Sequence, residues 1–313
     1  MISRFLLDDL AMAFADDDPE LIEQIFQDLL SHFSYVEGLG LNVYCWSEVW
    51  YIQSPSGRTV HDAVYSDGYI DRDLRNLFAS KLGRLPFWDE LPDSIEASEG
   101  VSIQNETFPL VPTVARAAEM YRMNQMCALV TSAALRRSAW EDVIVLPSEL
   151  ASRIYFLSEP ESRSKFWRSV ALGEKLNAEQ ISEIAARAFP QLRFADGVWG
   201  QTSRLEGSFA DLRTLLVNTL GGLNDFALEI WAKFANPYDI QNRMSALAHV
   251  DCSPESPNTR RNVKAMRERD VAYDGGVVRC EWHAKLQPHR NRIHFNVTEN
   301  RILIGLFADH LTI

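Results

Sequence analysis

Residues 1–249 carry a hydrophobic pattern that predicts mainly helices. Between Pro19 and Phe33, apolar residues recur at intervals of three and four positions. The segment starts with Asp18, a residue type that caps helix N-termini, and Pro19 suits the first helical turn. The same spacing recurs at residues 71–82, 112–126, 177–189 and 209–234. Each of these segments is therefore expected to be an amphipathic helix.

Two features interrupt this helical pattern. Gly221 and Gly222 fall inside the segment 209–234, and we expect them to separate two helices. Residues 41–54 are rich in aromatic and β-branched side chains, which predicts one or two short strands. The first 249 residues are thus expected to form a helix-dominated region with few strands.

The pattern changes near residue 250. Serine and proline cluster in residues 250–259, ahead of a short basic helix, which indicates a domain boundary. Beyond it the hydrophobic period becomes two, as in strands with one polar and one apolar face. Strands are expected at residues 275–286, 292–297 and 301–311. The predicted fold class is α+β, with helix-dominated residues 1–249 followed by an antiparallel β-meander within residues 250–313.

The register of the last two strands follows from their pattern. If Glu299 and Asn300 form a two-residue turn, Thr298 pairs with Arg301 and His294 pairs with Gly305. One face of the meander is then apolar, and the other displays polar side chains. Opposite His294, the glycine would leave a notch where a substrate could approach the backbone.

The polar face supplies candidates for metal-independent cleavage of RNA. Histidine exchanges protons near neutral pH, so His283 and His294 are the candidate general acid and base. Lys285 and Arg292 are candidate phosphate ligands, because fixed cations stabilise charge that develops on phosphorus. Further candidates are Glu281 and His310 for proton transfer or orientation, and Arg279, His289 and Arg290 for contacts with the RNA backbone.

Charge divides the chain in the same place. The whole chain of 313 residues has a net charge of -12, but residues 241–313 carry eleven basic and eight acidic residues, net +3. Residues 1–240 carry net -15, and five of the seven histidines lie in the smaller, basic part. The net negative charge excludes binding of a polyanion through the overall field of the protein. A site for a polyanion therefore has to be local and to lie in the C-terminal part. We expect the acidic region to regulate this site, by sensing a trigger or by covering the basic face.

The sequence does not support several other classes of protein, including nucleotide-binding, metal-dependent and membrane proteins. Neither a phosphate-binding GxxxxGK[ST] nor a GxGxxG motif occurs, and HExxH is absent. The aspartates at 16–18 and at 67, 71 and 73 precede helical segments, so we interpret them as helix caps in preference to a magnesium site. No run of eighteen apolar residues and no signal peptide occurs, and the four scattered cysteines suit buried thiols. A cytoplasmic protein without a membrane partner is expected.

A zinc site is the competing chemistry for the same face. Alternating strand positions can converge on a metal, and His283, His294, Glu281 and His310 are the possible ligands. Lys285 and Arg292 would share that face, and neighbouring cations disfavour a divalent ion. We therefore expect no cofactor.

The C-terminal segments resemble a known family. The run "EWHAKL", "NRIHF" and "ILIGLFADHL", preceded by a helix, is similar to the sheet of RelE-like toxins, which are compact metal-independent endoribonucleases. It also resembles the C-terminal segments of bacterial defence or toxin proteins with long helical N-terminal regions. The likeness covers about 60 residues, from Ser256 onward. RelE-like toxins are shorter than this chain, and the extra length argues against ribosome-dependent cleavage.

Two hypotheses about function result. In the first, the protein is an endoribonuclease toxin that acts in growth arrest or anti-phage defence, with RNA as substrate and an antitoxin or defence protein as possible partner. In the second, the same face is a non-enzymatic module that binds RNA or an anionic protein. Substitution of His283 and His294 by alanine would separate the two hypotheses. A nuclease should lose turnover and still bind RNA, whereas a binding module should change only in affinity.

Overall fold

The computed structural model describes residues 2–14, 18–66, 68–91, 100–108, 111–147, 150–298 and 301–312. The chain forms two compact units, Met1–Phe166 (unit 1) and Trp167–Ile313 (unit 2). This division differs from the boundary expected near residue 250, because the helices after residue 167 pack with the C-terminal sheet. The expected turn at Glu299 and Asn300, and the aspartates at 16, 17 and 67, lie outside the described residues.

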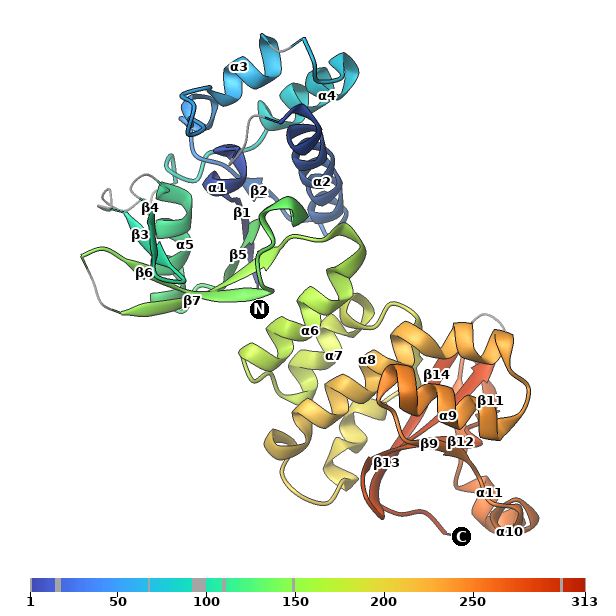
Figure 1. Ribbon diagram of the computed structural model, residues 1–313. Coiled ribbons are helices and arrows are strands. Elements are labelled where there is room, and N and C mark those ends of the chain that lie inside the picture. Colours follow the sequence, from blue (N-terminus) through green and yellow to red (C-terminus); the bar gives the residue numbers. More distant parts are fainter. Residues whose placement is uncertain are drawn as a thin grey trace. The chain divides into compact units, whose positions relative to one another are not determined.

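Unit 1 contains a seven-stranded mixed sheet in the order β2-β1-β5-β7-β6-β3-β4 (Figure 1). Its strands are β1 (Arg4–Leu7), β2 (Val43–Tyr44), β3 (Val101–Ile103), β4 (Glu106–Phe108), β5 (Cys127–Val130), β6 (Trp140–Val145) and β7 (Ala151–Leu157). The first four strands of that order are parallel, and the other three extend the sheet in antiparallel fashion. Helical residues still outnumber strand residues in the described part of unit 1, as expected, but the seven-stranded sheet is more than the few strands that were expected. Strands such as β1 and β5 are short apolar runs, whose pattern does not separate a buried strand from a buried helix.

The helices of unit 1 mostly begin where the sequence predicts. They are α1 (Asp9–Met12), α2 (Pro19–Gly38), α3 (Val60–Tyr65), α4 (Arg72–Leu82) and α5 (Pro112–Arg122), with 3-10 turns η1 (Val49–Tyr51), η2 (Ala133–Leu135) and η3 (Pro160–Ser162). Asp18 caps α2 by accepting a hydrogen bond from the Glu20 amide at 3.1 Å. Phe26 of α2 stacks on Phe78 of α4, with ring centroids 4.0 Å apart. Within residues 41–54, β2 forms one short strand, as predicted.

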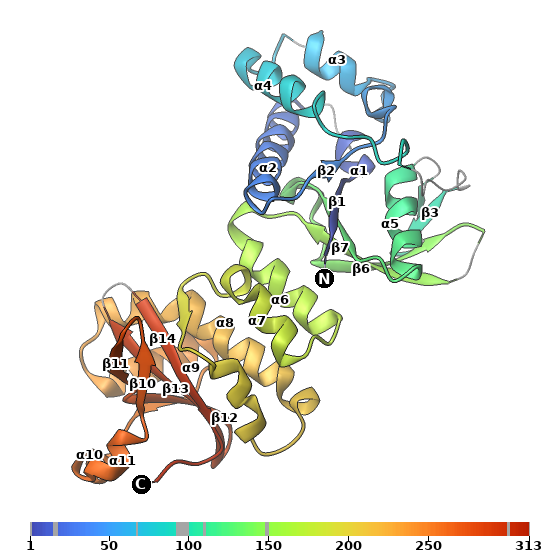
Figure 2. The same ribbon diagram turned by 180° about the vertical axis from the view of Figure 1, so that it is seen from behind.

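Unit 2 is a five-stranded sheet, in the order β8-β14-β13-β12-β9, with a separate hairpin of β10 and β11 (Figure 2). Its strands are β8 (Leu192–Phe194), β9 (Cys252–Pro254), β10 (Asp270–Tyr273), β11 (Gly276–Arg279), β12 (Trp282–Gln287), β13 (Arg290–Thr298) and β14 (Arg301–Ala308). Its helices are α7 (Ala178–Ala188), α8 (Phe209–Lys233), α9 (Pro237–Ala248), α10 (Pro257–Arg261) and α11 (Val263–Arg267), with η4 (Val198–Arg204); α6 (Arg163–Gly173) spans the division between the units. The antiparallel meander β12-β13-β14 is confirmed. The sheet is larger than expected, because β9 pairs with β12 and β8 runs parallel to β14.

Helix α8 is continuous through Gly221 and Gly222, so the expected break there is wrong. A Cβ atom on Gly222 would lie 2.6 Å from Cγ2 of Val250, and one on Gly221 would lie 2.5 Å from Nη1 of Arg168. These glycines therefore let neighbouring groups approach the helix closely. Close packing in a helix, and not termination of it, explains the pair of glycines.

The register of β13 and β14 agrees with the prediction for half of its length. Thr298 pairs with Arg301, and the next three pairs also match. Between His294 and Phe295 a β-bulge shifts the pairing, so that His294 lies opposite Leu306 and not opposite Gly305. The expected notch is absent as well, since a Cβ on Gly305 would lie 2.3 Å from Sγ of Cys280. The space beside this glycine is occupied by the protein itself.

All four cysteines are buried and free, as predicted. No helix in the described ranges is both long and apolar enough to span a bilayer.

Replacement of Gly305 by alanine should destabilise unit 2 by about 2 kcal/mol or more, because the added methyl group overlaps the buried Cys280 sulfur. Gly276→Ala is the matched control, since the nearest atom to its new Cβ is 3.7 Å away. Urea unfolding would measure both variants. Equal midpoints for Gly305→Ala and the wild type would contradict the packing described for the bulge.

Unit 1 buries His32 of α2 completely. Burial lowers the pKa of this imidazole from its ordinary 6.5 to about 4, and the nearby backbone of Ser158 opposes this effect in part. The unfolded chain therefore binds a proton below pH 6.5 that the folded chain does not bind until about pH 4. Stability conferred by the neutral imidazole is complete above pH 6.5 and declines as the pH falls.

Wild-type unit 1 should accordingly lose about 2 kcal/mol through His32 between pH 7 and pH 5. His32→Phe removes this component, so the variant should show a smaller loss over the same interval. His61→Phe, at an exposed position of α3, is the control and should keep the wild-type dependence. Identical pH dependence of the His32→Phe variant and the wild type in urea unfolding would refute the assignment.

Candidate functional site

His283 and His294 face each other directly across β12 and β13. Their ring centroids are 5.5 Å apart, so the sequence prediction that they share one face of the sheet is confirmed. Ser253 of β9 pairs with His283 on the other side, and its Oγ lies 3.2 Å from Nε2 of that imidazole. Strand alternation places the next residues on the opposite face, where Trp282 and Phe295 contact Trp231 of α8.

The two histidines are buried, so the expectation of an open polar face is wrong at their positions. His294 is 0% exposed and His283 is 8% exposed. Figures 1 and 2 show why: α8 and α9 cover one face of the sheet, and the β10–β11 hairpin lies over the other. A buried polar side chain has to find a partner within the protein, because leaving it unpaired costs free energy.

That partner is the carboxylate of Glu255, which directly follows β9. Its Oε1 lies 3.4 Å from Nδ1 of His283 and 3.5 Å from Nδ1 of His294. Arg269 holds the same carboxylate, with Nε 2.8 Å from Oε1 and Nη2 donating to Oε2 at 3.1 Å. Nη1 of this arginine donates to the Ala265 carbonyl oxygen at 2.7 Å. We refer to Glu255, Arg269, His283 and His294 as the buried cluster.

Sequence reasoning missed both Glu255 and Arg269. Glu255 lies in the serine- and proline-rich segment that indicates a domain boundary, and Arg269 follows the short basic helices α10 and α11. Neither position belongs to the alternating strand pattern. The sequence held one signal for Glu255. It is an acidic residue close to the segments that carry His283 and His294, and those histidines need an acidic partner if they are buried.

Charge in the buried cluster is set by its ion pairs. Burial alone would raise the pKa of Glu255, but His283, His294 and Arg269 together hold it well below the ordinary range. Burial lowers the pKa of His294, with Glu255 opposing this effect and His283 adding to it. The carboxylate is therefore ionised and His294 is neutral at physiological pH.

Three predicted residues lie near the cluster on the sheet. Lys285 and Arg292 pair across β12 and β13, two positions along from the histidines, and so share their face. Nζ of Lys285 lies 3.1 Å from both carboxylate oxygens of Asp251. Glu281 lies just before β12 and contacts Nη2 of Arg260 at 3.6 Å, so it is not the carboxylate that contacts the histidines.

The other predicted residues are dispersed over the surface. Arg279 of β11 forms a bidentate ion pair with Asp270, and Arg290 pairs with Glu206 at 2.8 Å. His289 is exposed in the turn between β12 and β13, as predicted. His310 is exposed beyond β14, with Nδ1 3.4 Å from the Leu311 carbonyl oxygen. The structure therefore does not bring these four residues together.

The candidate zinc ligands also differ from those predicted. Within the described part of the chain, the residues that could hold a metal are Glu255, His283 and His294, with ligand atoms within 4.8 Å of one another. Glu281 and His310 are replaced by the single carboxylate of Glu255. Two histidines and a carboxylate are a ligand set that transition metals use in proteins.

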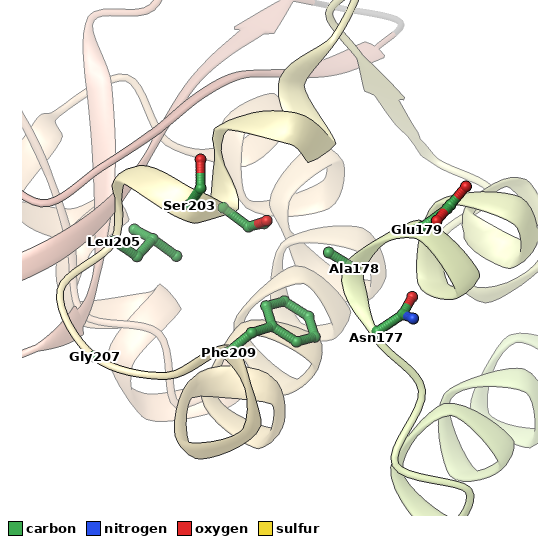
Figure 3. Close-up of a pocket in the computed structure, with 8 residues that line it drawn as sticks. Asn177, Ala178, Glu179, Ser203, Leu205, Gly207 and Phe209 are labelled. Carbon is green, nitrogen blue, oxygen red and sulfur yellow. The ribbon is translucent and has the colours of Figure 1, made fainter.

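A pocket of about 350 Å³ lies elsewhere in unit 2, between the start of α7 and the segment from η4 to α8 (Figure 3). Its lining residues are Asn177, Ala178, Glu179, Thr202, Ser203, Leu205, Gly207 and Phe209. None of them was predicted to be functional, and a carboxylate at its rim opposes an anionic ligand. The buried cluster is therefore the better candidate site.

Removal of one partner from the buried ion pair should be costly. Glu255→Leu leaves Arg269, which is 1% exposed, without its counter-charge, and we expect a loss of about 3 kcal/mol or more. Arg269→Met should cost a similar amount. The double variant should lose less than the sum of the two, because it leaves no unpaired charge between these positions. Strictly additive losses in urea unfolding would show that the pair is not coupled.

Comparisons with models of protein families, with curated proteins and with solved structures found no match for this chain. The geometry of the buried cluster is therefore the basis for the functional argument.

Proposed function

We propose that unit 2 is a metal-independent endoribonuclease in which His283 transfers the proton. The observation that carries the proposal is the position of its imidazole between the Ser253 hydroxyl and the Glu255 carboxylate, at 3.2 and 3.4 Å. A carboxylate at Nδ1 fixes the tautomer and orientation of a histidine and stabilises the imidazolium that forms during proton transfer. Nε2 is then the basic nitrogen, on the side of the partly exposed edge strand β9.

His294 has a different role in this proposal. It is fully buried and neutral, so it cannot reach a phosphate from inside the sheet. It contacts the same Oε1 of Glu255 that faces His283. His294 is therefore a positioning residue, which helps to hold the carboxylate in place beneath the reacting imidazole.

Lys285 and Arg292 supply the charge that binds the phosphate. The ion pair between Lys285 and Asp251 is solvent-accessible, with the aspartate side chain 65% exposed. Such surface pairs contribute only about 0–1 kcal/mol, so an RNA phosphate can replace Asp251 at little cost. Arg292 lies directly across the strands from Lys285 and can contact the same phosphate.

The reaction that these groups suit is transesterification within the RNA strand. Nε2 of His283 takes the proton of a 2′-hydroxyl, whose oxygen forms a bond to the adjacent phosphorus. The bond from phosphorus to the 5′-oxygen breaks, and that oxygen takes a proton from the Lys285 ammonium group. The products are a 2′,3′-cyclic phosphate and a 5′-hydroxyl end, with no metal or water needed for the step.

Purified full-length protein should cleave labelled RNA in the presence of EDTA. His283→Gln should reduce the cleavage rate by about 100-fold or more, because general acid–base catalysis typically contributes that much. His289→Gln is the matched control, since this histidine is exposed in the turn after the same strand. RNA binding should be unchanged in both variants.

Two outcomes would overturn the proposal. Cleavage by His283→Gln at the wild-type rate would remove the histidine from the mechanism. Binding of RNA by the wild type with no cleavage would favour the non-enzymatic module. Thermal unfolding of each variant shows that it is folded, so that loss of cleavage is not loss of structure.

A further inference from the structure

The distances within the buried cluster are unusual for hydrogen bonds. Oε1 of Glu255 lies 3.4 and 3.5 Å from the two Nδ1 atoms, whereas N–H···O bonds in proteins span about 2.7–3.2 Å. A tetrahedral zinc ion with bonds of about 2.0–2.1 Å separates its ligand atoms by about 3.3–3.4 Å. The two distances from Oε1 therefore fit a shared ion better than they fit direct hydrogen bonds, and the three ligand atoms lie within 4.8 Å of one another.

Hydrogen bonding leaves several atoms of the cluster unsatisfied. Within the described residues, Nδ1 of His283 and both ring nitrogens of His294 are buried without a hydrogen-bond partner, and Oε1 of Glu255, which is ion-paired with Nε of Arg269, accepts no hydrogen bond from either imidazole. Each unsatisfied buried group costs about 1–3 kcal/mol. One metal ion would satisfy a donor atom on each of the three side chains.

Surrounding residues hold two of these ligands in place. Ser253 contacts Nε2 of His283, which leaves Nδ1 with its lone pair directed at Glu255 when Nε2 carries the proton. Arg269 binds the carboxylate through both oxygens and so fixes its orientation. Its positive charge lowers the affinity for any cation, and the two imidazole ligands select metals that accept nitrogen over magnesium or calcium.

We propose that Glu255, His283 and His294 form a binding site for a divalent transition-metal ion of the zinc class, and that this ion inhibits the protein. The ion would lie on the Nδ1 side of His283, between Glu255, which is 6% exposed, and His294, which is 0% exposed, so the site is unsuited to metal catalysis. Bound metal would instead occupy Nδ1 of His283 and engage Glu255, which must be free to stabilise the imidazolium. The inhibitory part of this inference rests on the proposed function, and the binding site itself does not.

Binding is tested on EDTA-treated full-length protein by titration with Co²⁺, which reports tetrahedral coordination through its visible absorption. One equivalent should bind to the wild type, and Zn²⁺ should displace it. His294→Phe should bind at least 100-fold more weakly, whereas the control His310→Phe should bind as the wild type does. Absence of the absorption band in the wild type, or its retention in His294→Phe, would overturn the site.

A second measurement guards against a variant that does not fold. Zn²⁺ should raise the thermal unfolding midpoint of the wild type, because it binds the folded state only. An unchanged wild-type midpoint at saturating Zn²⁺ would overturn the site independently of any substitution.

RNA cleavage by the wild type distinguishes the two proposals. Cleavage in EDTA that one equivalent of Zn²⁺ abolishes supports both the nuclease and its inhibition. Co²⁺ binding without any cleavage in EDTA overturns the nuclease and leaves the metal site standing. Cleavage in EDTA without Co²⁺ binding overturns the metal site and leaves the nuclease standing. Cleavage that increases with Zn²⁺ would overturn both the inhibition and the metal-independent mechanism.

Discussion

The ion pair between Glu255 and Arg269 is the interaction on which the centre of unit 2 depends. Both side chains are nearly inaccessible to water, at 6% and 1% exposure, and each compensates the charge of the other. The pair joins the end of β9 to the segment after α11, which are fourteen residues apart in the chain. Without it, the two imidazoles on the adjoining strands would face a buried surface with no carboxylate to orient them.

The sheet explains how such a cluster can exist. Three neighbouring strands present Ser253, His283 and His294 in one row, and their other faces pack on α8 through aromatic side chains. The row is held by backbone pairing, so its geometry does not depend on the flexibility of single side chains. The three residues of this row differ in exposure to solvent. Ser253 is partly exposed, His283 is nearly buried and His294 is fully buried. This gradient is the reason for assigning the two histidines different roles.

Local sequence signals predicted much of unit 2 and less of unit 1. Asp18 and Pro19 identified the start of α2, and strand alternation placed His283 and His294 together, because each signal depends only on neighbouring positions. The strand β5 was missed since four apolar residues carry no period. The bulge after His294 and the close packing beside Gly305 were missed, and so was Glu255, whose partners are distant in sequence. These features depend on tertiary packing, which pattern analysis of a single sequence does not contain.

The central claim is that His283 activates a 2′-hydroxyl of RNA, and the chemistry of the cleaved ends tests it most directly. RNA cut by the wild-type protein in EDTA should carry a 2′,3′-cyclic phosphate on the upstream fragment and a 5′-hydroxyl on the downstream one. Substrate with a 2′-deoxy residue at the cleavage position should remain intact. Fragments with a 5′-phosphate and a 3′-hydroxyl, or cleavage at the deoxy position, would contradict the account.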